Sequence, residues 1–361
     1  MKKIKVLQQV LNPSGSGGVS TEFRALQQSK LAEVYEFVPM ILMESHRGLN
    51  RHDIGFYYRA IKRERPDIVH VRGAAIDGLN AEIAARLAGC GKVLVTVHGM
   101  YSDMVYYPGW KKWISKHIIE RLVFQLAGGI SCVCRTAMER PYFDRYREKM
   151  LPFVYNRMPT FDRSRQAEYR KAVRQAYGIP ETDTVALYLG GMSREKGLDV
   201  LAESLRTFST WPANLTVLMV GGGAYRAAME RMCREISPKI VFTGDQRDIQ
   251  RFYAAGDFFI QPSLHENHSI AILEACAAGL PCVVTDCGGN AETVTDGVTG
   301  VVVPVGDSKA LADGIRTMLD RKRRAEFRHQ VETADFSRFS NEAADAALGE
   351  VYQKLLEREI K

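Results

Sequence analysis

The chain has 361 residues, of which 46% are hydrophobic, and its formal net charge at pH 7 is +7. The length is too great for one ordinary hydrophobic core, so we expect two domains. The composition is ordinary for a globular protein, and no apolar run reaches the ~18 residues that a membrane-spanning helix needs.

The chain begins with MKKIKVLQQVLNPSGSGG, a short apolar stretch that runs into a glycine-rich turn. We interpret this segment as a first strand rather than as a signal peptide. The seven cysteines show no CxxC spacing, and no histidine cluster points to zinc. We therefore expect reduced core thiols, a cytoplasmic protein and no metal site.

The first 160 residues alternate between strand-like and helix-like patterns. Amphipathic stretches at 21–31, 54–63 and 78–87 separate apolar runs, and this alternation predicts a parallel, doubly wound sheet. The runs predicted as strands are residues 4–10, 34–38, 68–71, 93–97, 130–133 and 151–155.

The second half repeats this plan after a polar, strand-poor stretch at 157–183. A final helix is predicted over 341–356, with one apolar stripe formed by Ala344, Leu348, Val351 and Leu355. The strands predicted here are residues 185–189, 215–220, 240–243, 258–261, 282–285 and 300–303.

Two carboxylates eight residues apart, Glu266 and Glu274, lie between the strands at 258–261 and 282–285. The helix between them, about 269–278, is stopped by Gly279 and Pro281. In a βαβ unit the helix N-terminus lies at the carboxyl end of a strand, where α/β sheets bind phosphorylated ligands. Glu274 is ~7–8 Å along the axis from that N-terminus, roughly the span from a pyrophosphate to a ribose.

The residues around this pair carry further motifs. PS precedes Glu266, LEA surrounds Glu274, and A-x-G-x-P, V-x-T-D, GG and E-x-V follow. Upstream and downstream stand YLGGMSREKGLDVL (188–201), LMVGGG (218–223) and DGVTGVVVPVGD (296–307). Together they resemble family four of the retaining glycosyltransferases with the GT-B fold and its E-x7-E motif, as found in bacterial surface-polysaccharide enzymes. The resemblance covers most of 180–335 and is looser over the first 160 residues.

The resemblance implies an α/β fold of two Rossmann-like domains that face a cleft. Residues 1–160 would form an acceptor-side domain, and residues 161–335 would bind the nucleotide sugar. Residues 336–361 would carry the C-terminal helix back onto the first domain. No cofactor or metal is implied, because the nucleotide-diphosphate sugar is a co-substrate.

The resemblance also implies roles for residues near the acidic pair. Glu266 would hold hydroxyls of the transferred sugar, and Glu274 would hold the ribose. The backbone N–H groups of Asn267, His268 and Ser269 would bind the diphosphate, because a helix N-terminus has unpaired donors. His268 stands where relatives often have an aromatic or glycine residue, and we expect it to pack on the sugar or to replace that aromatic.

Lys196, after the strand at 185–189, would neutralise the leaving diphosphate. The family usually has an arginine five residues before this lysine, where this chain has Gly191. Arg194 is the nearest candidate to take its place, although its side chain could also point to solvent. In the first half, the loop with Gly15, Gly17 and Gly18 resembles the family's donor-phosphate loop.

His98 ends the strand at 93–97 and would lie against the transferred sugar or its phosphate; a buried, structural histidine is the alternative. Arg72, at the end of the preceding strand, is a weaker acceptor-site candidate. We therefore expect Glu266, Lys196 and His98 to be catalytic. Gly17, Gly18, Arg194, Asn267, His268, Ser269 and Glu274 would bind the donor.

Charge is unevenly distributed along the chain. Residues 1–160 contain 24 Lys+Arg against 14 Asp+Glu, whereas the other 201 residues contain 25 against 28. Two tryptophans bracket two lysines in YYPGWKKWISK, a composition that suits a membrane interface as well as an ordinary covering helix. We expect an anionic acceptor or peripheral contact with the inner face of the membrane, and no nucleic acid.

These observations predict a retaining glycosyltransferase that moves a hexose-type sugar to a hydroxyl acceptor, a glycan or a lipid-linked sugar. Polysaccharide or glycolipid assembly is the expected setting. One alternative is a catalytically impaired relative that only binds a sugar nucleotide, which Gly191 suggests. A sugar-nucleotide epimerase of the same fold is the other alternative.

Overall fold

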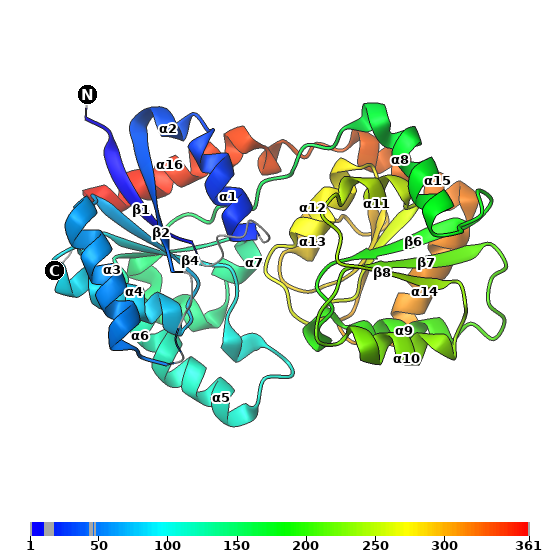
Figure 1. Cartoon of the computed structure of the whole chain (residues 1–361), viewed down its shortest axis with the longest axis horizontal. Helices are drawn as coiled ribbons and strands as arrows, with labels where there is room; N and C mark the ends of the chain where they lie inside the picture. Colours follow the sequence, from blue (N-terminus) through cyan, green and yellow to red (C-terminus); the bar gives the residue numbers. More distant parts are fainter. Residues whose placement is uncertain (1, 11–17, 43–45, 47, 360–361) are drawn as a thin grey trace. The chain divides into compact units, whose positions relative to one another are not determined.

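A computed structural model describes residues 2–10, 18–42, 46 and 48–359. The chain divides into two compact units, Met1–Arg157 with Ser337–Lys361, and Met158–Phe336 (Figure 1). The expected domain boundaries, after residues 160 and 335, lie beside these divisions. Each unit is an α/β structure around its own parallel sheet, so the predicted fold class is confirmed.

The first unit has a five-stranded parallel sheet in the order β2-β1-β3-β4-β5. Its strands are β1 (Ile4–Val10), β2 (Tyr35–Ile41), β3 (Ile68–Arg72), β4 (Val93–Val97) and β5 (Gly129–Cys132). Its longer helices are α1 (Gly18–Gln27), α3 (Arg51–Glu64), α4 (Ile76–Leu87), α5 (Gly109–Ile114), α6 (Glu120–Leu126) and α16 (Asn341–Glu357). The short helices α2 (Leu31–Val34) and α7 (Arg135–Met138) complete it.

Successive strand residues point to opposite faces of this sheet and so build two cores. Leu7 packs with α3, α4 and α6 on one face, whereas Val6 packs with α1 and α16 on the other. The predicted stripe Ala344, Leu348, Val351 and Leu355 is buried in the second core. The C-terminal helix therefore completes the first unit, as Figure 1 shows for α16 beside β1 and α1.

One strand predicted for the first half is wrong. Residues 151–155 form no strand, although the N–H groups of Leu151 and Val154 donate to the carbonyls of Ile130 and Cys132. The pairing is too irregular for a ladder because Pro152 has no N–H to donate. The helix expected after Trp110 is present, and a π-helical turn, Ser115–Ile119, connects α5 to α6.

The second unit has a six-stranded parallel sheet in the order β11-β10-β9-β6-β7-β8. Its strands are β6 (Thr184–Leu189), β7 (Leu215–Val220), β8 (Ile240–Gly244), β9 (Phe258–Gln261), β10 (Cys282–Thr285) and β11 (Gly300–Val303). Its helices are α8 (Gln166–Ala176), α9 (Leu198–Arg206), α10 (Arg226–Arg234), α11 (Gln250–Ala255), α12 (Ile270–Ala277), α13 (Asn290–Thr293), α14 (Ser308–Leu319) and α15 (Arg321–Thr333).

Helices cover both faces of this sheet, which explains why its strands are apolar throughout. One core joins β6 to α9, α10 and α14, through Tyr188 among others. The other joins it to α8, α11 and α12 through Leu187. Within the described residues, no helix combines the length and apolarity that crossing a membrane requires.

A buried acid in α4 predicts how stability should depend on pH. Glu82 is 0% exposed, and neither of its carboxylate oxygens has a hydrogen-bond partner among the described residues. Burial raises the pKa of Glu82 well above its ordinary value of 4.5, against the opposing charges of Lys149 and Arg86. Below the ordinary pKa of 4.5, Glu82 is protonated in both the folded and the unfolded protein, and the folded state keeps its full stability. As the pH rises toward the raised pKa of the folded protein, Glu82 ionises more readily in the unfolded state, so the free energy of unfolding falls.

Replacing Glu82 with glutamine should therefore stabilise the protein by about 1–3 kcal/mol at pH 8, and by much less at pH 5. Urea denaturation of both proteins at the two pH values measures this difference. Glu120 supplies a matched control, because it is equally buried but accepts hydrogen bonds from Ser102 and Ser115. Glu120→Gln should destabilise at both pH values. A stability gain for Glu82→Gln that is equal at pH 5 and pH 8 would contradict the assignment.

Candidate functional site

Lys196 and Glu266 meet at the carboxyl edge of the second sheet. Lys196 follows β6 in a short 3₁₀ turn, Arg194–Lys196, and Glu266 follows β9. Their side chains form an ion pair between Nζ and Oε1 although seventy residues separate them in the sequence. Lys196 is 31% exposed and Glu266 is 13% exposed, so the pair is accessible from solvent.

Gly197 makes this approach possible. Its φ is 66°, and a Cβ there would lie 1.8 Å from the carbonyl oxygen of Pro262. Only glycine combines this backbone conformation with so close a contact. The N–H of Leu264 donates to the carbonyl of Glu195 at 2.9 Å and ties the two loops together. The glycine after Lys196 therefore fixes the lysine beside the loop that carries Glu266.

Polar side chains at the end of β9 hold Glu266 in place. Gln261 Nε2 and Ser263 Oγ donate to its Oε1 at 2.6 and 3.1 Å. The other end of the Gln261 amide accepts from Ser269 Oγ at 3.0 Å. Ser269 is also the N-cap of α12 and accepts from the N–H of Ile272. One amide thus links the Glu266 carboxylate to the start of α12.

The residues between Glu266 and α12 are buried. The carbonyl of Asn267 accepts from the N–H of Gly289 at 2.5 Å. His268 Nε2 lies 3.2 Å from Thr293 Oγ1 of α13, so the His268 ring packs inside the unit. Ser269, the third residue expected to bind the diphosphate, uses its side chain to cap α12. The segment still places the N-terminus of α12, with its positive partial charge, directly after Glu266.

Glu274 lies on α12 beside a small hollow. It accepts a hydrogen bond from Tyr253 Oη at 2.7 Å, and it is half-buried. Burial raises the pKa of Glu274, and the Tyr253 hydroxyl partly opposes this shift. The hollow is lined by Pro159, Thr160, Phe161, Ile249, Gln250, Tyr253, Glu274 and Ala277. A carboxylate and a phenol on its wall provide hydrogen-bonding groups for hydroxyls of a ligand.

Arg194 is directed toward its own unit's surface helices. Its side chain is 53% exposed, and its Nε lies 3.6 Å from Asp199 Oδ2. Its guanidinium also lies over the ring of Tyr225, at 5.8 Å. The side chain that reaches Glu266 is Lys196, two residues later. Gly191, where the family usually has arginine, has open space around the position of a Cβ.

His98 follows β4 at the carboxyl edge of the first sheet. Its Nε2 lies 3.5 Å from Nη1 of Arg72, whose side chain is 1% exposed and pairs with Glu22 Oε2 at 2.6 Å. Burial lowers the pKa of His98 to about 4, Glu22 opposes this shift, and Arg72 adds to it. His98 is therefore neutral at pH 7 and lies next to a buried arginine–glutamate pair.

A relay of hydrogen bonds, which the sequence did not reveal, supports this pair from the C-terminal helix. Gln8 Oε1 accepts from Arg72 Nη2 at 2.8 Å, and Gln8 Nε2 donates to Tyr352 Oη at 3.0 Å. Tyr352 Oη also lies 2.8 Å from His70 Nδ1. Tyr352 of α16 thus orients the Gln8 amide that holds Arg72. No local pattern could predict it, because 344 residues separate Gln8 from Tyr352.

The glycine-rich loop is only partly described. Gly18 is the first residue of α1. Gly15 and Gly17 lie outside the described residues, so their expected place in a donor loop stays a prediction.

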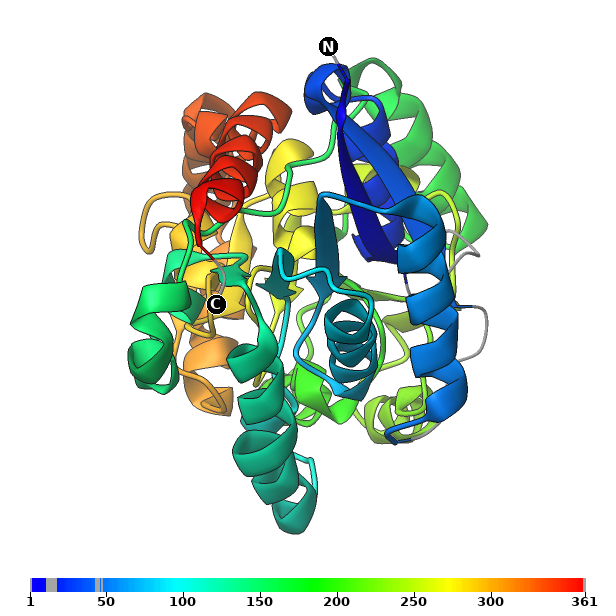
Figure 2. The same ribbon diagram turned by 90° about the vertical axis from the view of Figure 1, so that its left-hand side faces the viewer.

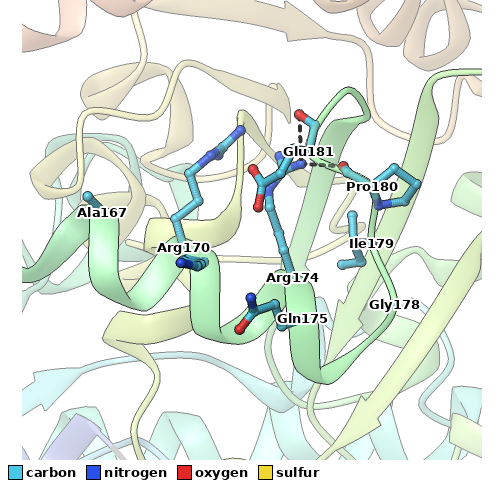
Figure 3. A pocket seen from close by; sticks show the side chains of 9 residues that line it. Ala167, Arg170, Arg174, Gln175, Gly178, Ile179, Pro180 and Glu181 are labelled. Atoms are coloured by element: carbon cyan, nitrogen blue, oxygen red, sulfur yellow. Dashed lines mark hydrogen bonds between the residues drawn. The ribbon is translucent and has the colours of Figure 1, made fainter.

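A larger hollow lies elsewhere on the second unit, along α8 (Figure 3). Figure 3 shows Arg174 reaching the carbonyls of Pro180 and Glu181, the first at 2.8 Å. Arg174 also pairs with Asp257 at 2.9 Å, as does Arg170. The lining residues 178–181 come shortly before β6 in the chain. The hollow therefore lies at the amino edge of the sheet, whereas Lys196 and Glu266 lie at its carboxyl edge. Its arginines serve to anchor α8, because carbonyls and Asp257 engage their guanidinium groups.

Each of the two units matches a known family of glycosyltransferase domains. The family described as Glycosyltransferase Family 4 matches residues 19–140, and the one described as Glycosyl transferases group 1 matches residues 183–321. The first match lies within the first unit, and the second match contains Lys196, Glu266 and Glu274.

Curated proteins of similar sequence include two bacterial enzymes. N-acetyl-alpha-D-glucosaminyl L-malate synthase of Bacillus anthracis is 22% identical over 299 residues, which cover 82% of this chain and 76% of that protein. UDP-Gal:alpha-D-GlcNAc-diphosphoundecaprenol alpha-1,3-galactosyltransferase of Escherichia coli is 25% identical over 275 residues, 73% of this chain and 69% of that one.

Solved structures share the whole fold. HepE of Anabaena, in complex with UDP-glucose, aligns with a TM-score of 0.77 at 17% identity and covers 97% of this chain and 100% of its own. A glycosyltransferase of Rickettsia africae aligns with a TM-score of 0.74 at 20% identity, covering 99% and 100%. The chain is therefore a glycosyltransferase of the GT-B fold, with a Glycosyltransferase Family 4 domain in its first unit and a Glycosyl transferases group 1 domain in its second.

Proposed function

We propose that this glycosyltransferase moves a hexose-type sugar from a nucleotide-diphosphate sugar to a hydroxyl acceptor, with retention of the anomeric configuration. The observation that carries the proposal is the meeting of Lys196 and Glu266 at the carboxyl edge of the second sheet, directly before α12. This edge is where parallel α/β sheets bind their ligands, and a helix N-terminus there favours a diphosphate.

Different residues of this site would bind the diphosphate, the sugar and the ribose of the donor. Lys196 and the N-terminus of α12 would meet the negative charge that develops on the leaving diphosphate. Glu266, fixed by Gln261 and Ser263, would accept hydrogen bonds from sugar hydroxyls. Glu274, in its hollow on α12, would accept hydrogen bonds from the ribose. In the free protein Lys196 pairs with Glu266, so donor binding would exchange that partner for a phosphate.

Retention would follow from attack on the same face that the diphosphate leaves. The leaving phosphate would then take the acceptor's proton, so the reaction needs no enzymic nucleophile. His98 would lie against the transferred sugar or its phosphate as a neutral hydrogen-bonding group, since its pKa is lowered to about 4. We expect sugar transfer to need no metal, because Lys196 and the helix dipole supply the stabilising charge.

For the acceptor we propose a glycan or a lipid-linked sugar used in polysaccharide or glycolipid assembly at the inner face of the membrane. The Escherichia coli relative is named for a diphosphoundecaprenol-linked acceptor. The first unit of this chain offers a surface suited to such a location. In Figure 2 the helix that begins at α5 extends beyond the rest of that unit.

Exposed apolar and basic side chains gather on residues 101–122. Trp110 and Trp113 are 65% and 58% exposed, and Lys111 and Lys112 lie between them. The exposed large apolar side chains of this segment are Tyr101, Val105, Tyr106, Trp110, Trp113, Ile118 and Leu122. Aromatic rings with interleaved lysines suit the headgroup layer of an anionic membrane.

We therefore expect the protein to bind anionic vesicles, and the double variant Lys111→Glu, Lys112→Glu to bind them at least about thirtyfold more weakly. Each lysine near an anionic surface contributes ~1 kcal/mol, and salt screens the attraction. Co-sedimentation with vesicles of anionic or neutral lipid measures the binding. The control variant is Lys309→Glu, Lys322→Glu, which makes the same charge change in the second unit. Equal binding by the two double variants, or by the two kinds of vesicle, would contradict this contact.

A screen of nucleotide sugars for thermal stabilisation tests the proposed donor class. A ligand that binds only the folded state stabilises it by RT ln(1 + [L]/Kd), about 2.7 kcal/mol at a hundredfold excess over Kd. We expect one nucleotide-diphosphate sugar to raise Tm more than its free sugar does. Stabilisation by none of them would contradict the proposal.

The second candidate is a relative that binds the donor without transferring the sugar, which Gly191 favours. Donor hydrolysis in the absence of acceptor separates the two functions, since only an active enzyme consumes the donor. The variant Gly191→Arg restores the usual residue, and a Cβ at this position would meet no atom within 4 Å. An inactive wild type whose Gly191→Arg variant hydrolyses the donor would establish the impaired relative.

A further inference from the structure

Two histidines and an aspartate converge where the loop after β2 enters α3 in the first unit. His46 lies in that loop, and His52 and Asp53 lie in the first turn of α3. His46 Nδ1 is 2.7 Å from Asp53 Oδ1, and His52 Nδ1 is 3.7 Å from the same oxygen. One ligating atom from each residue lies within 4.8 Å of the other two. None of these residues belongs to the transferase site described above.

The carboxylate at the centre of this cluster is fully buried. Asp53 is 0% exposed, whereas the side chains of His46 and His52 are 46% and 67% exposed. A buried charge needs a counter-charge. Across the ion pairs of the described residues, Asp53 pairs only with these two imidazoles. A cation bound between the rings and the carboxylate would supply that counter-charge.

The ligand set matches a particular class of metal. Imidazole nitrogens with one carboxylate oxygen suit Zn²⁺ and its neighbours in the first transition row, whereas Mg²⁺ and Ca²⁺ prefer oxygen ligands. Three protein ligands leave a fourth, tetrahedral position to water. Tetrahedral metal–ligand bonds of about 2.0–2.2 Å hold ligand atoms about 3.4 Å apart. His46 Nδ1 and Asp53 Oδ1, now 2.7 Å apart, would therefore separate as the metal replaces the proton between them, and His52 Nδ1 would approach from 3.7 Å.

The residues behind the ligands hold the carboxylate in place. Asp53 Oδ2 accepts from the backbone N–H of His46 at 2.9 Å, which leaves Oδ1 directed toward the two rings. Asn50 Oδ1 accepts from the N–H of His52 at 2.8 Å and caps α3. Such second-shell hydrogen bonds orient the ligands of protein metal sites. A backbone N–H thus holds the Asp53 carboxylate, whereas the two imidazoles are exposed.

We propose that His46, His52 and Asp53 form a binding site for a divalent transition-metal ion of the Zn²⁺ class. The ion joins the loop after β2 to the first turn of α3 and stabilises that junction. This site is structural and independent of the proposed sugar transfer, because it takes no group from Lys196, Glu266, Glu274 or His98. Its metal is therefore expected to change stability and not the chemistry of transfer.

The test uses the untagged full chain after treatment with a chelator. Calorimetric titration with Zn²⁺ should show one site, and Co²⁺ should give the visible absorption of a tetrahedral site with nitrogen ligands. Zn²⁺ should also raise Tm. His52→Asn and Asp53→Asn should each weaken Zn²⁺ binding at least tenfold and remove the Co²⁺ absorption. The control variant, His117→Asn, replaces an exposed histidine outside the cluster and should bind as the wild type does.

His52→Asn is the decisive variant, because its exposed side chain can be changed without opening a cavity in the core. Circular dichroism would show that it is folded. A wild type that binds no Zn²⁺ at 100 μM would overturn the proposal. Binding that persists unchanged in both His52→Asn and Asp53→Asn would overturn it as well, since the metal would then lie elsewhere. In either case the His46–Asp53 contact is only a hydrogen bond that closes the loop onto α3.

Discussion

Replacing Lys196 with alanine should lower donor turnover about 10²–10³-fold while the affinity for a free nucleoside changes little. The ammonium would meet charge that appears on the diphosphate only as the glycosidic bond breaks, and removal of one such preorganised group typically costs this much. The geometry supports a direct effect, because Lys196 is held beside Glu266 by the close packing of Gly197 against Pro262. Steady-state kinetics with the donor and calorimetry with the nucleoside give the two quantities.

Lys239 offers the matched control for this variant. It is a half-exposed lysine of the same unit that pairs with buried Asp183 at 2.8 Å, before the strands at the amino edge of the sheet. Lys239→Ala should therefore alter stability without a selective loss of turnover. An equal loss of turnover and of nucleoside affinity in Lys196→Ala would reduce Lys196 to a general binding residue. Full activity would exclude it from the reaction.

Replacing Glu274 with glutamine should weaken the binding of a nucleoside diphosphate by about tenfold to a hundredfold. A hydrogen bond between a buried carboxylate and a hydroxyl contributes ~1.5–3 kcal/mol, and 1.4 kcal/mol corresponds to a factor of ten. The place of Glu274 on the wall of a hollow, with Tyr253 Oη 2.7 Å away, suits the recognition of ribose hydroxyls. Titration calorimetry with the nucleoside diphosphate measures the change.

The pH dependence gives this prediction a second readout. Burial raises the pKa of Glu274, and its ionised form accepts stronger hydrogen bonds than its protonated form does. Nucleotide affinity in the wild type should therefore decline as the pH falls toward that raised pKa, and Glu274→Gln should lack this decline. Tyr253→Phe keeps the carboxylate and removes only its phenol partner, so it should bind more tightly than Glu274→Gln. A folded Glu274→Gln protein with unchanged affinity would contradict the ribose assignment.

The sequence was most informative where local pattern and architecture agree. The strands β9 and β10 have the predicted bounds, because each is a short apolar run next to turn-forming residues. The same reasoning placed Glu266 and Lys196 after the carboxyl ends of strands, and parallel neighbours bring such ends to one edge. The pairing of these two side chains needed the strand order, since β6 and β9 are adjacent only in the folded sheet.

Other features depend on contacts that no local pattern contains. Tyr352 reaches Gln8 and His70 from the opposite end of the chain. The sequence showed no histidine cluster because His46 and His52 are six residues apart and meet only through the turn into α3. The extended segment after Met150 has the composition of a strand, yet Pro152 and the short pairing with β5 leave it outside the sheet.

Consumption of the donor, followed by proton NMR of its anomeric signals, tests the central claim most directly. The wild type should consume one α-linked nucleotide-diphosphate sugar and release the sugar, or transfer it to an added acceptor, as the α-anomer before mutarotation. Glu266→Gln should abolish this consumption. A β-anomer as the first product would contradict retention, and a wild type that consumes donor no faster than Glu266→Gln would contradict the placement of catalysis at the Lys196–Glu266 pair.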